Sequence, residues 1–231
     1  MRRRLFASSV AGITTALFVG LCLSSSLLAQ SPQLQTKNGR RFPTVIFTYV
    51  FWNATPASYT FAIDSTGSVI YRSAPESLEN TGVPYALLFQ ANDSTRRTIF
   101  NVARNLEFFS GEFPVAVGSP QISPVRTLTY RDLTFNNLIT YSDSTNSEIQ
   151  ELTSIFEEIS ATLEFGRTLT YFREHDKRKL ENQLTTMRRE AERHHLRELQ
   201  AIAPVLRSIV ADKDLTDEAR SQARAVLNST H

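Results

Sequence analysis

The stretch "SYTFAIDSTGSVIYRS", residues 58–73, alternates apolar and polar side chains on both sides of Ser65-Thr66-Gly67. Alternation with a period of two is typical of a strand that buries one face, and a short glycine-containing break between two such runs is typical of a hairpin turn. We therefore predict a β-hairpin. One face should carry Tyr59, Phe61 and Ile63, and Val69 and Tyr71 should continue it across the turn.

Four further runs of β-branched and aromatic residues surround this hairpin. They are "TVIFTYVFWN" (44–53), "YALLFQ" (85–90), "RTLTYRD" (126–132) and "NNLITYSDS" (136–144). Such composition favours strands. For the last two runs, we expect Leu128, Tyr130, Leu138 and Tyr141 to be the facing positions.

A helix is predicted between these strands, at about residues 95–106. Asp93 or Ser94 can cap it, because short polar side chains satisfy the free amides of a first turn. Its apolar stripe consists of Ile99, Phe100, Ala103 and Leu106.

At Thr145 the hydrophobic period changes from two to 3.6. Thr145 and Glu148 have the spacing of a capping box. The apolar residues that follow step by three and four, which places them on one face of a helix over 146–165; they are Ile149, Leu152, Phe156, Ile159 and Leu163. Glu151, Glu157 and Glu158 should point away from that face into solvent.

Three more helical segments are predicted towards the C-terminus. Asp176 caps one with Leu180, Leu184, Met187 and Ala191 as its stripe, and Thr216 caps the last. The segment between them carries Leu199, Ile202, Leu206 and Ile209, where Pro204 predicts a kink or a fresh helix start. The fold class is thus α+β: a mostly antiparallel sheet covered by helices (44–165), followed by a helical C-terminal region (166–231).

The N-terminus has the parts of a secretory signal peptide. Three arginines at positions 2–4 precede an apolar stretch that ends near Ala29. We expect residues 1–29 to be a signal peptide, 30–43 a flexible linker, and the protein to be periplasmic or extracellular in a bacterium. The alternative is an uncleaved N-terminal membrane anchor, which would be the chain's one contact with a membrane.

Charge and cysteine content exclude several function classes. Without residues 1–29 the chain has 22 Lys+Arg against 23 Asp+Glu, a net charge of −1, which gives no reason to expect nucleic acid as a partner. The single cysteine, Cys22, lies in the signal segment. The exported chain therefore lacks a disulfide, a thiol nucleophile and a cysteine metal ligand.

The charges are unevenly distributed along the chain. Residues 44–165 carry six Arg and 13 acids, whereas residues 166–231 carry 13 Lys+Arg and ten acids, so the net charges are −7 and +3. The simpler interpretation is that the two parts attract each other and pack. The alternative is that the basic tail binds anionic envelope material.

"EAERHHLRE", residues 190–198, is the one stretch that suggests a metal site. On a continuous helix Glu190, His194 and Glu198 would share a face, and histidine with carboxylate can bind zinc. The same spacing gives ordinary ion pairs on a solvated helix, which is the interpretation we favour. His195 should continue the apolar stripe as a half-buried packing residue.

Other candidate chemistry is sparse. Glu174-His175-Asp176 resembles an acid–base cluster, but neighbours on a helix point in different directions, so a helix end fits better. The sequence has no GxSxG elbow and no phosphate-binding glycine loop. We assign no catalytic residue, no metal ligand and no cofactor. Phe51, Trp52 and Tyr59 could form a carbohydrate-binding patch, although aromatic side chains in strands more often pack in the core.

The order of elements resembles that of emfourin-like inhibitors of thermolysin-type metallopeptidases. The similarity covers at most residues 44–165 and rests on "YTFAIDSTGSVIY", "TIFNVARNLEFF", "RTLTYRD", "LITYSDS" and "SEIQELTSIFEEI". No inhibitory residue is carried over, because "TYVFWNATPASYTF" stands where that family has a glycine-rich first strand. The chain as a whole resembles secreted bacterial proteins.

These observations favour a non-enzymatic secreted or envelope binding protein. The resemblance implies that its partner is a peptidase, and another envelope protein is the second possibility. The competing hypothesis is a hydrolase whose active site is dispersed along the chain; a pocket that holds His175 with two carboxylates would favour it.

Overall fold

The structure is a computed structural model that describes residues 42–74 and 85–229. The predicted signal peptide (1–29), nearly all of the predicted linker (30–43) and His231 lie outside the described residues. The described residues all belong to one compact unit, Leu34–His231.

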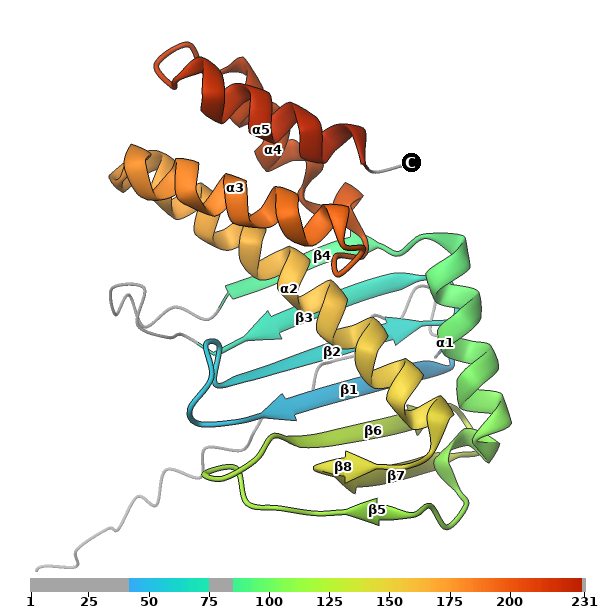
Figure 1. Ribbon diagram of the computed structural model, residues 1–231. Coiled ribbons are helices and arrows are strands. Elements are labelled where there is room, and N and C mark those ends of the chain that lie inside the picture. The colour runs from blue at the N-terminus through green and yellow to red at the C-terminus, as the bar shows by residue number, and fades with distance from the viewer. Residues whose placement is uncertain (1–41, 75–84, 230–231) are drawn as a thin grey trace, which may run out of the picture. The chain divides into compact units, whose positions relative to one another are not determined.

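The centre of the fold is a six-stranded sheet in which every neighbouring pair is antiparallel (Figure 1). Its strands in spatial order are β4 (Tyr85–Gln90), β3 (Ser68–Ser73), β2 (Ser58–Asp64), β1 (Thr44–Val50), β6 (Val125–Arg131) and β7 (Asn136–Tyr141). Two short strands, β5 (Val115–Ala116) and β8 (Asp143–Ser144), form a separate pair. With the helices described below, this confirms the predicted α+β class.

The predicted hairpin is β2–β3. Asp64 Oδ1 accepts hydrogen bonds from the backbone amides of Thr66 (2.8 Å) and Ser68 (3.1 Å), which closes the turn. Gly67 has φ +89°, a backbone conformation that favours glycine because it has no Cβ. The predicted inner face is confirmed, since Tyr59, Phe61, Ile63, Val69 and Tyr71 are all buried.

One facing position was predicted wrongly. Leu138 is 60% exposed, and Ile139 and Tyr141 are the residues of β7 that face the core. Side chains of a strand alternate between its two faces, so Leu138 and Tyr141, three positions apart, cannot share one. Leu128 and Tyr130 of β6 are buried as expected.

Helix α1 (Asp93–Asn105) lies on one face of the sheet, and Ile99, Ala103 and Leu106 beside it are buried (Figure 1). The predicted cap is wrong: Asn92 is the N-cap residue, and no side chain of the helix's own first turn caps it. Instead the backbone amide of Asn92 donates to Glu198, 106 residues further along the chain.

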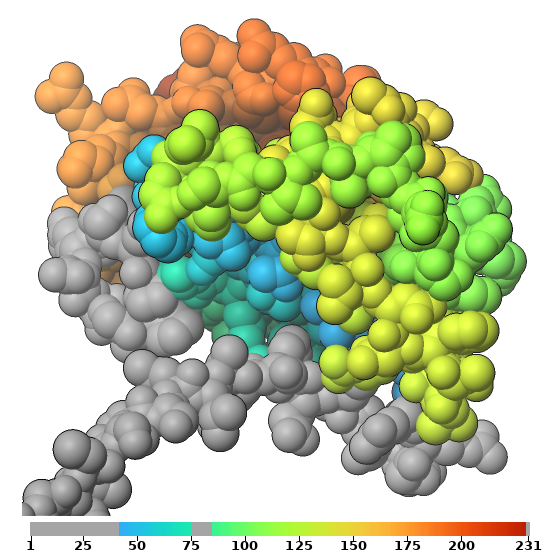
Figure 2. Space-filling view, turned by 90° about the horizontal axis from the view of Figure 1, so that it is seen from below, coloured from blue at the N-terminus to red at the C-terminus, as the bar shows by residue number. Residues whose placement is uncertain are grey.

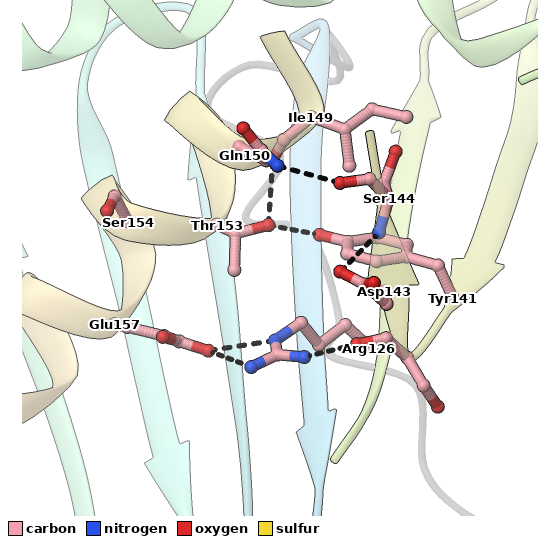
Figure 3. A pocket seen from close by; sticks show the side chains of 10 residues that line it. Arg126, Tyr141, Asp143, Ser144, Ile149, Gln150, Thr153, Ser154 and Glu157 are labelled. Carbon is pink, nitrogen blue, oxygen red and sulfur yellow. Dashed lines mark hydrogen bonds and ion pairs between the residues drawn. The ribbon is translucent and has the colours of Figure 1, made fainter. Parts of the chain in front are cut away.

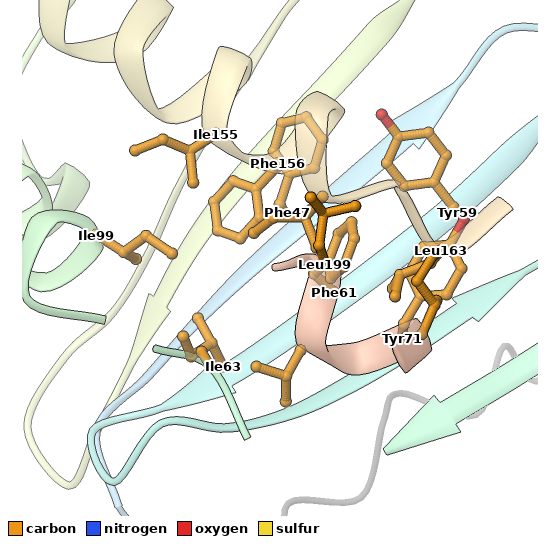
Figure 4. Packing of buried hydrophobic residues seen from close by; sticks show 14 of the residues in the cluster. Phe47, Tyr59, Phe61, Ile63, Tyr71, Ile99, Ile155, Phe156, Leu163 and Leu199 are labelled. Carbon is orange, nitrogen blue, oxygen red and sulfur yellow. The ribbon is translucent and has the colours of Figure 1, made fainter. Parts of the chain in front are cut away.

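Helix α2 (Ser147–His175) covers the same face of the sheet. All five predicted apolar positions, Ile149, Leu152, Phe156, Ile159 and Leu163, are at most 2% exposed. Phe156 stacks on Phe47 of β1 with ring centroids 4.9 Å apart, and its centroid is 5.6 Å from that of Phe61 (Figure 4). The cap is Asn146 rather than Thr145; its side chain accepts from the amides of Glu148 and Ile149.

Helix α2 continues without a break through Gly166, so the predicted boundary between residues 165 and 166 falls inside it. A Cβ at Gly166 would lie 2.5 Å from Ile202 Cγ2. The glycine therefore permits close approach of another segment rather than ending the helix.

The C-terminal region consists of α3 (Lys177–Glu192), the 3-10 turn η2 (Leu199–Ile202), α4 (Ala203–Ala211) and α5 (Asp217–Asn228). The predicted caps Asp176 and Thr216 are confirmed, because each side chain accepts a backbone amide of the following first turn. Pro204 lies in the first turn of α4, which is the predicted fresh start. Helix α2 contacts α3, η2 and α4, while α5 packs on α3 and α4.

We predict that Phe156→Ala lowers the free energy of unfolding by about 3–5 kcal/mol, because it removes a buried ring and leaves a cavity. Total domain stability is only about 5–15 kcal/mol, so the melting temperature should fall sharply. The measurement is thermal or denaturant unfolding followed by circular dichroism.

Glu151→Ala is the matched control on the same helix, since Glu151 is exposed and should change stability by less than about 0.5 kcal/mol. Glu157 is unsuitable because it is ion-paired to Arg126. Equal melting of the Phe156 and Glu151 variants would contradict the packing of α2 on the sheet.

Candidate functional site

A row of four tyrosines crosses the sheet beneath α2. Tyr49, Tyr59, Tyr71 and Tyr85 lie on the neighbouring strands β1, β2, β3 and β4. Consecutive ring centroids are 4.7, 6.0 and 6.0 Å apart. These distances are within the range of favourable aromatic pairs, so the row is one packed unit.

Polar side chains of α2 lie above this row. Glu164 accepts a hydrogen bond from Tyr71 Oη (2.7 Å), and its carboxylate lies 2.7 Å from Arg167 Nε. At the other end of the row, Glu157 pairs with Arg126 of β6 at 2.8 Å. The Arg126 guanidinium also lies 5.7 Å from the centre of the Tyr49 ring, a cation–π distance.

Burial keeps the tyrosine phenols of this row protonated. Burial, followed by the charge of Glu164, raises the pKa of Tyr85 to about 12. The same two causes, in the same order, raise the pKa of Tyr71 well above its usual value. Both phenols therefore stay protonated well above neutral pH and can donate hydrogen bonds.

Two cavities lie on either side of the Arg126–Glu157 pair. The larger, about 250 Å³ and here called the tyrosine cavity, is lined by Tyr49, Ala54, Thr55, Pro56, Tyr59, Arg126, Glu157, Ser160, Ala161 and Glu164. The smaller, about 160 Å³, lies between the start of α2 and the segment after β7 (Figure 3).

Polar groups in the smaller cavity already bind each other. Arg126 donates to Glu157 and to the backbone oxygen of Ser142, and Gln150 donates to the backbone oxygen of Ser144 (Figure 3). The linings of both cavities contain no histidine, cysteine or lysine. The arrangement thus offers hydrogen bonding and aromatic contact to a ligand.

Two loops at one end of the sheet carry exposed apolar side chains. Trp52, after β1, is 59% exposed, and Ile122, before β6, is 82% exposed. The Trp52 amide donates to the Pro120 carbonyl (3.0 Å), and Asn53 Nδ2 donates to the Gln121 carbonyl (3.0 Å). In Figure 2 the lime-green chain around β5 and the start of β6 lies against the blue chain of β1.

The three aromatic residues proposed as a carbohydrate patch do not form one surface. Tyr59 is 6% exposed and belongs to the core, whereas Trp52 stands on the loop. Strand β1 ends at Val50, so Trp52 lies beyond the strand. The alternation of side chains that places Tyr59 in the core therefore does not predict where the Trp52 side chain points.

The residues considered for a metal site are also separated. Helix α3 ends at Glu192, so Glu190, His194 and Glu198 do not share a helical face. His195, expected to be half-buried, has a side chain that is 62% exposed; its Nδ1 lies 2.9 Å from Glu190 Oε2, and this hydrogen bond lowers the pKa of Glu190. Among the described residues no group of three or more His, Cys, Asp or Glu side chains is placed to hold a metal ion.

His175 is the last residue of α2 and contacts Tyr171. Its Nδ1 donates to the backbone oxygen of Tyr171 (2.8 Å), and its ring stacks on the Tyr171 ring. Asp176 is engaged as the cap of α3. The segment is a helix end, as the favoured interpretation stated.

Two acids predicted to be solvated are instead paired across the fold. Glu157 binds Arg126, and Glu158 binds Arg197 at 2.9 Å. The Glu158–Arg197 pair joins the acidic and basic parts of the chain, as the simpler interpretation of their charges expects. The sequence held no local signal for these pairs, because the arginines are 31 and 39 residues away.

No protein-family model matches the chain, and no curated protein is significantly similar to it in sequence. Within residues 42–74 and 85–229, no helix is both long and apolar enough to cross a membrane.

We predict a favourable coupling of about 1 kcal/mol between Arg126 and Glu157, measured by a double-mutant cycle of alanine variants in denaturant unfolding. The Arg126 side chain is only 16% exposed, so solvent screens the pair less than an exposed one. Arg220–Asp217 is the matched control, because Asp217 is 94% exposed and should show no measurable coupling. Equal coupling in both pairs would contradict a structural role for Arg126–Glu157.

Proposed function

We propose that this chain is an exported, non-enzymatic binding protein that recognises a protein partner with the two loops at the Trp52 end of its sheet. The observation that carries the proposal is the exposure of Trp52 and Ile122 on loops that are hydrogen-bonded to each other. Exposed apolar side chains gathered on one surface mark sites of interaction.

Order in the loops favours tight binding. Trp52 and Asn53 are tied to Pro120 and Gln121, and the amide of Ile122 donates to the carbonyl of Ser119 (2.9 Å). A surface already ordered before binding loses less conformational entropy on association. Tryptophan is among the residue types that most often dominate binding energy at interfaces.

The partner class we propose is a thermolysin-type metallopeptidase. The resemblance to emfourin-like inhibitors supports this choice, as does the order of strands, helix, strands and helix that the chain adopts. The hydrolase alternative receives no comparable support, because His175 lines neither of the two cavities beside Arg126.

The test is a titration of a thermolysin-type metallopeptidase with the purified protein. We expect inhibition that saturates at a one-to-one ratio, and we expect Trp52→Ala to weaken it by about 30-fold or more, the range of a hot-spot residue. The readout is the inhibition constant from steady-state peptide hydrolysis.

Leu133→Ala is the matched control. Leu133 is 84% exposed, and it follows β6 at the end of the sheet opposite Trp52, since Arg131 pairs with Thr44 and Val125 pairs with Val50. This variant should inhibit like the wild type. Equal losses in the Trp52 and Leu133 variants would rule out the loop surface. If no peptidase is inhibited, the peptidase proposal fails.

A pull-down from the native secreted fraction then tests the loop surface alone, and a partner captured equally by the wild type and the Trp52 variant would refute it. Elemental analysis of the purified protein tests the proposal that it is not an enzyme. Stoichiometric zinc would contradict that proposal.

A further inference from the structure

Glu198 lies in an unusual position for a charged residue. Its backbone has φ 62° and ψ 36°, in the left-handed region that non-glycine residues rarely adopt, and the residue is only 3% exposed. Its Oε2 accepts from the Asn92 amide (2.8 Å) and from Gln200 Nε2. Its Oε1 is buried and has no hydrogen-bond partner among the described residues.

An unpaired buried carboxylate oxygen needs an explanation, because leaving such an atom without a partner is costly. Backbone strain at a non-glycine residue is likewise concentrated at functional sites. His194, four residues earlier, also has a positive φ, of 59°. The connector between α3 and η2 is thus held in a strained conformation that turns Glu198 inward.

Glu198 lines a cavity of about 310 Å³, here called the Glu198 cavity. The start of α1 contributes Ser94 and Thr95, α2 contributes Glu158, and the connector contributes His194, Leu196 and Arg197. The cavity opens to solvent, and its volume is well above the roughly 10–15 Å³ that one water needs on this measure, so it has room for a small ligand. Polar groups from three separate segments converge on it.

The charge of the cavity selects a cation. Glu158 and Glu198 contribute −2 and Arg197 contributes +1, so the lining carries a net −1 with His194 neutral. Glu158 is already paired with Arg197 at 2.9 Å. The atom without a partner is therefore a carboxylate oxygen, which requires a donor rather than an acceptor. A metal ion is a poor candidate, because no group of three metal-binding side chains occurs among the described residues.

We propose that the Glu198 cavity binds the ammonium group of a primary amine, and that a small rotation of the Glu198 side chain on binding brings Oε1, buried in the free protein, to the ammonium as its acceptor. Leu196 and Leu199 in the lining offer apolar contact to the carbon chain of such a ligand. The ammonium can belong to a small amine or to a lysine side chain of a protein partner. This site is separate from the loops proposed above and does not depend on them.

The first experiment uses the full-length chain and n-propylamine hydrochloride as the probe, at constant ionic strength. Binding is measured by calorimetry and by shifts of the backbone amide NMR signals of Asn92 and Glu198. We expect saturable binding of propylamine and none of 1-propanol, which has a similar size and no charge. Nα-acetyl-lysine-N-methylamide tests the second source, since only a cavity open to a protein's lysine will bind it.

Glu198→Gln is the decisive variant. The amide oxygen of the glutamine can still accept from the Asn92 amide. The amide nitrogen takes the place of Oε1, and as a donor it cannot accept a hydrogen bond from an ammonium group. We expect its fold to be retained, with an unchanged circular dichroism spectrum, and its affinity for propylamine to fall at least about tenfold. Glu190→Gln is the matched control; Glu190 lies in the same region of the chain and pairs with His195 outside this cavity, so its binding should equal that of the wild type.

Three results would overturn the proposal. These are no saturable response of the wild type to either amine, equal binding of propanol and propylamine, or equal affinity of the Glu198→Gln variant and the wild type. If Glu198→Gln fails to fold, Leu196→Lys places an ammonium beside the same cavity without altering the cap. That variant should then no longer bind propylamine, and unchanged binding would equally refute the site.

Discussion

Phe156 stacks on Phe47 with ring centroids 4.9 Å apart and contacts Phe61 on the neighbouring strand. This contact attaches α2 to the sheet within the cluster of buried side chains. Burial of apolar area is the main favourable term in folding, and an aromatic side chain removes more area from water than most. Because α2 is 29 residues long, its position on the sheet also determines where the residues beyond the sheet are placed.

The second half of α2 provides the surface on which the C-terminal region assembles. Gly166 lets Ile202 approach the helix closely, and Leu169 is fully buried one turn further on. From there α3 and α4 pack on α2, and α5 packs on both. The sheet and the helical region are therefore joined by one continuous helix and share a single cluster of buried side chains.

Polar interactions of α2 follow from the same placement. Glu157, Glu158 and Glu164 each bind a different part of the fold: Arg126 on β6, Arg197 on the connector, and Tyr71 on β3. Glu198 adds a further link, because its carboxylate satisfies the amide at the start of α1. A helix N-terminus has free amides and a partial positive charge, so a carboxylate from a distant segment stabilises it as a local cap would.

The sequence alone determined the features that depend on near neighbours. Alternation of apolar and polar residues located the β2–β3 hairpin, and the 3.6-residue period located the buried face of α2. Asp176, Thr216 and Pro204 marked the starts of three helices. All these signals depend on residues only a few positions apart. Two predictions failed where neighbouring residues offered similar signals. Asn146 rather than Thr145 caps α2, and Ile139 rather than Leu138 faces the core.

Only the tertiary structure decided which polar groups meet. The pairs Arg126–Glu157 and Glu158–Arg197, the cap of α1 by Glu198, and the meeting of the Trp52 and Ile122 loops all join residues more than 30 positions apart. The residues next to a glutamate in the sequence do not show whether its carboxylate is solvated by water or paired with a distant arginine. Its partner is fixed by the path of the backbone, and that path follows from the packing of the core.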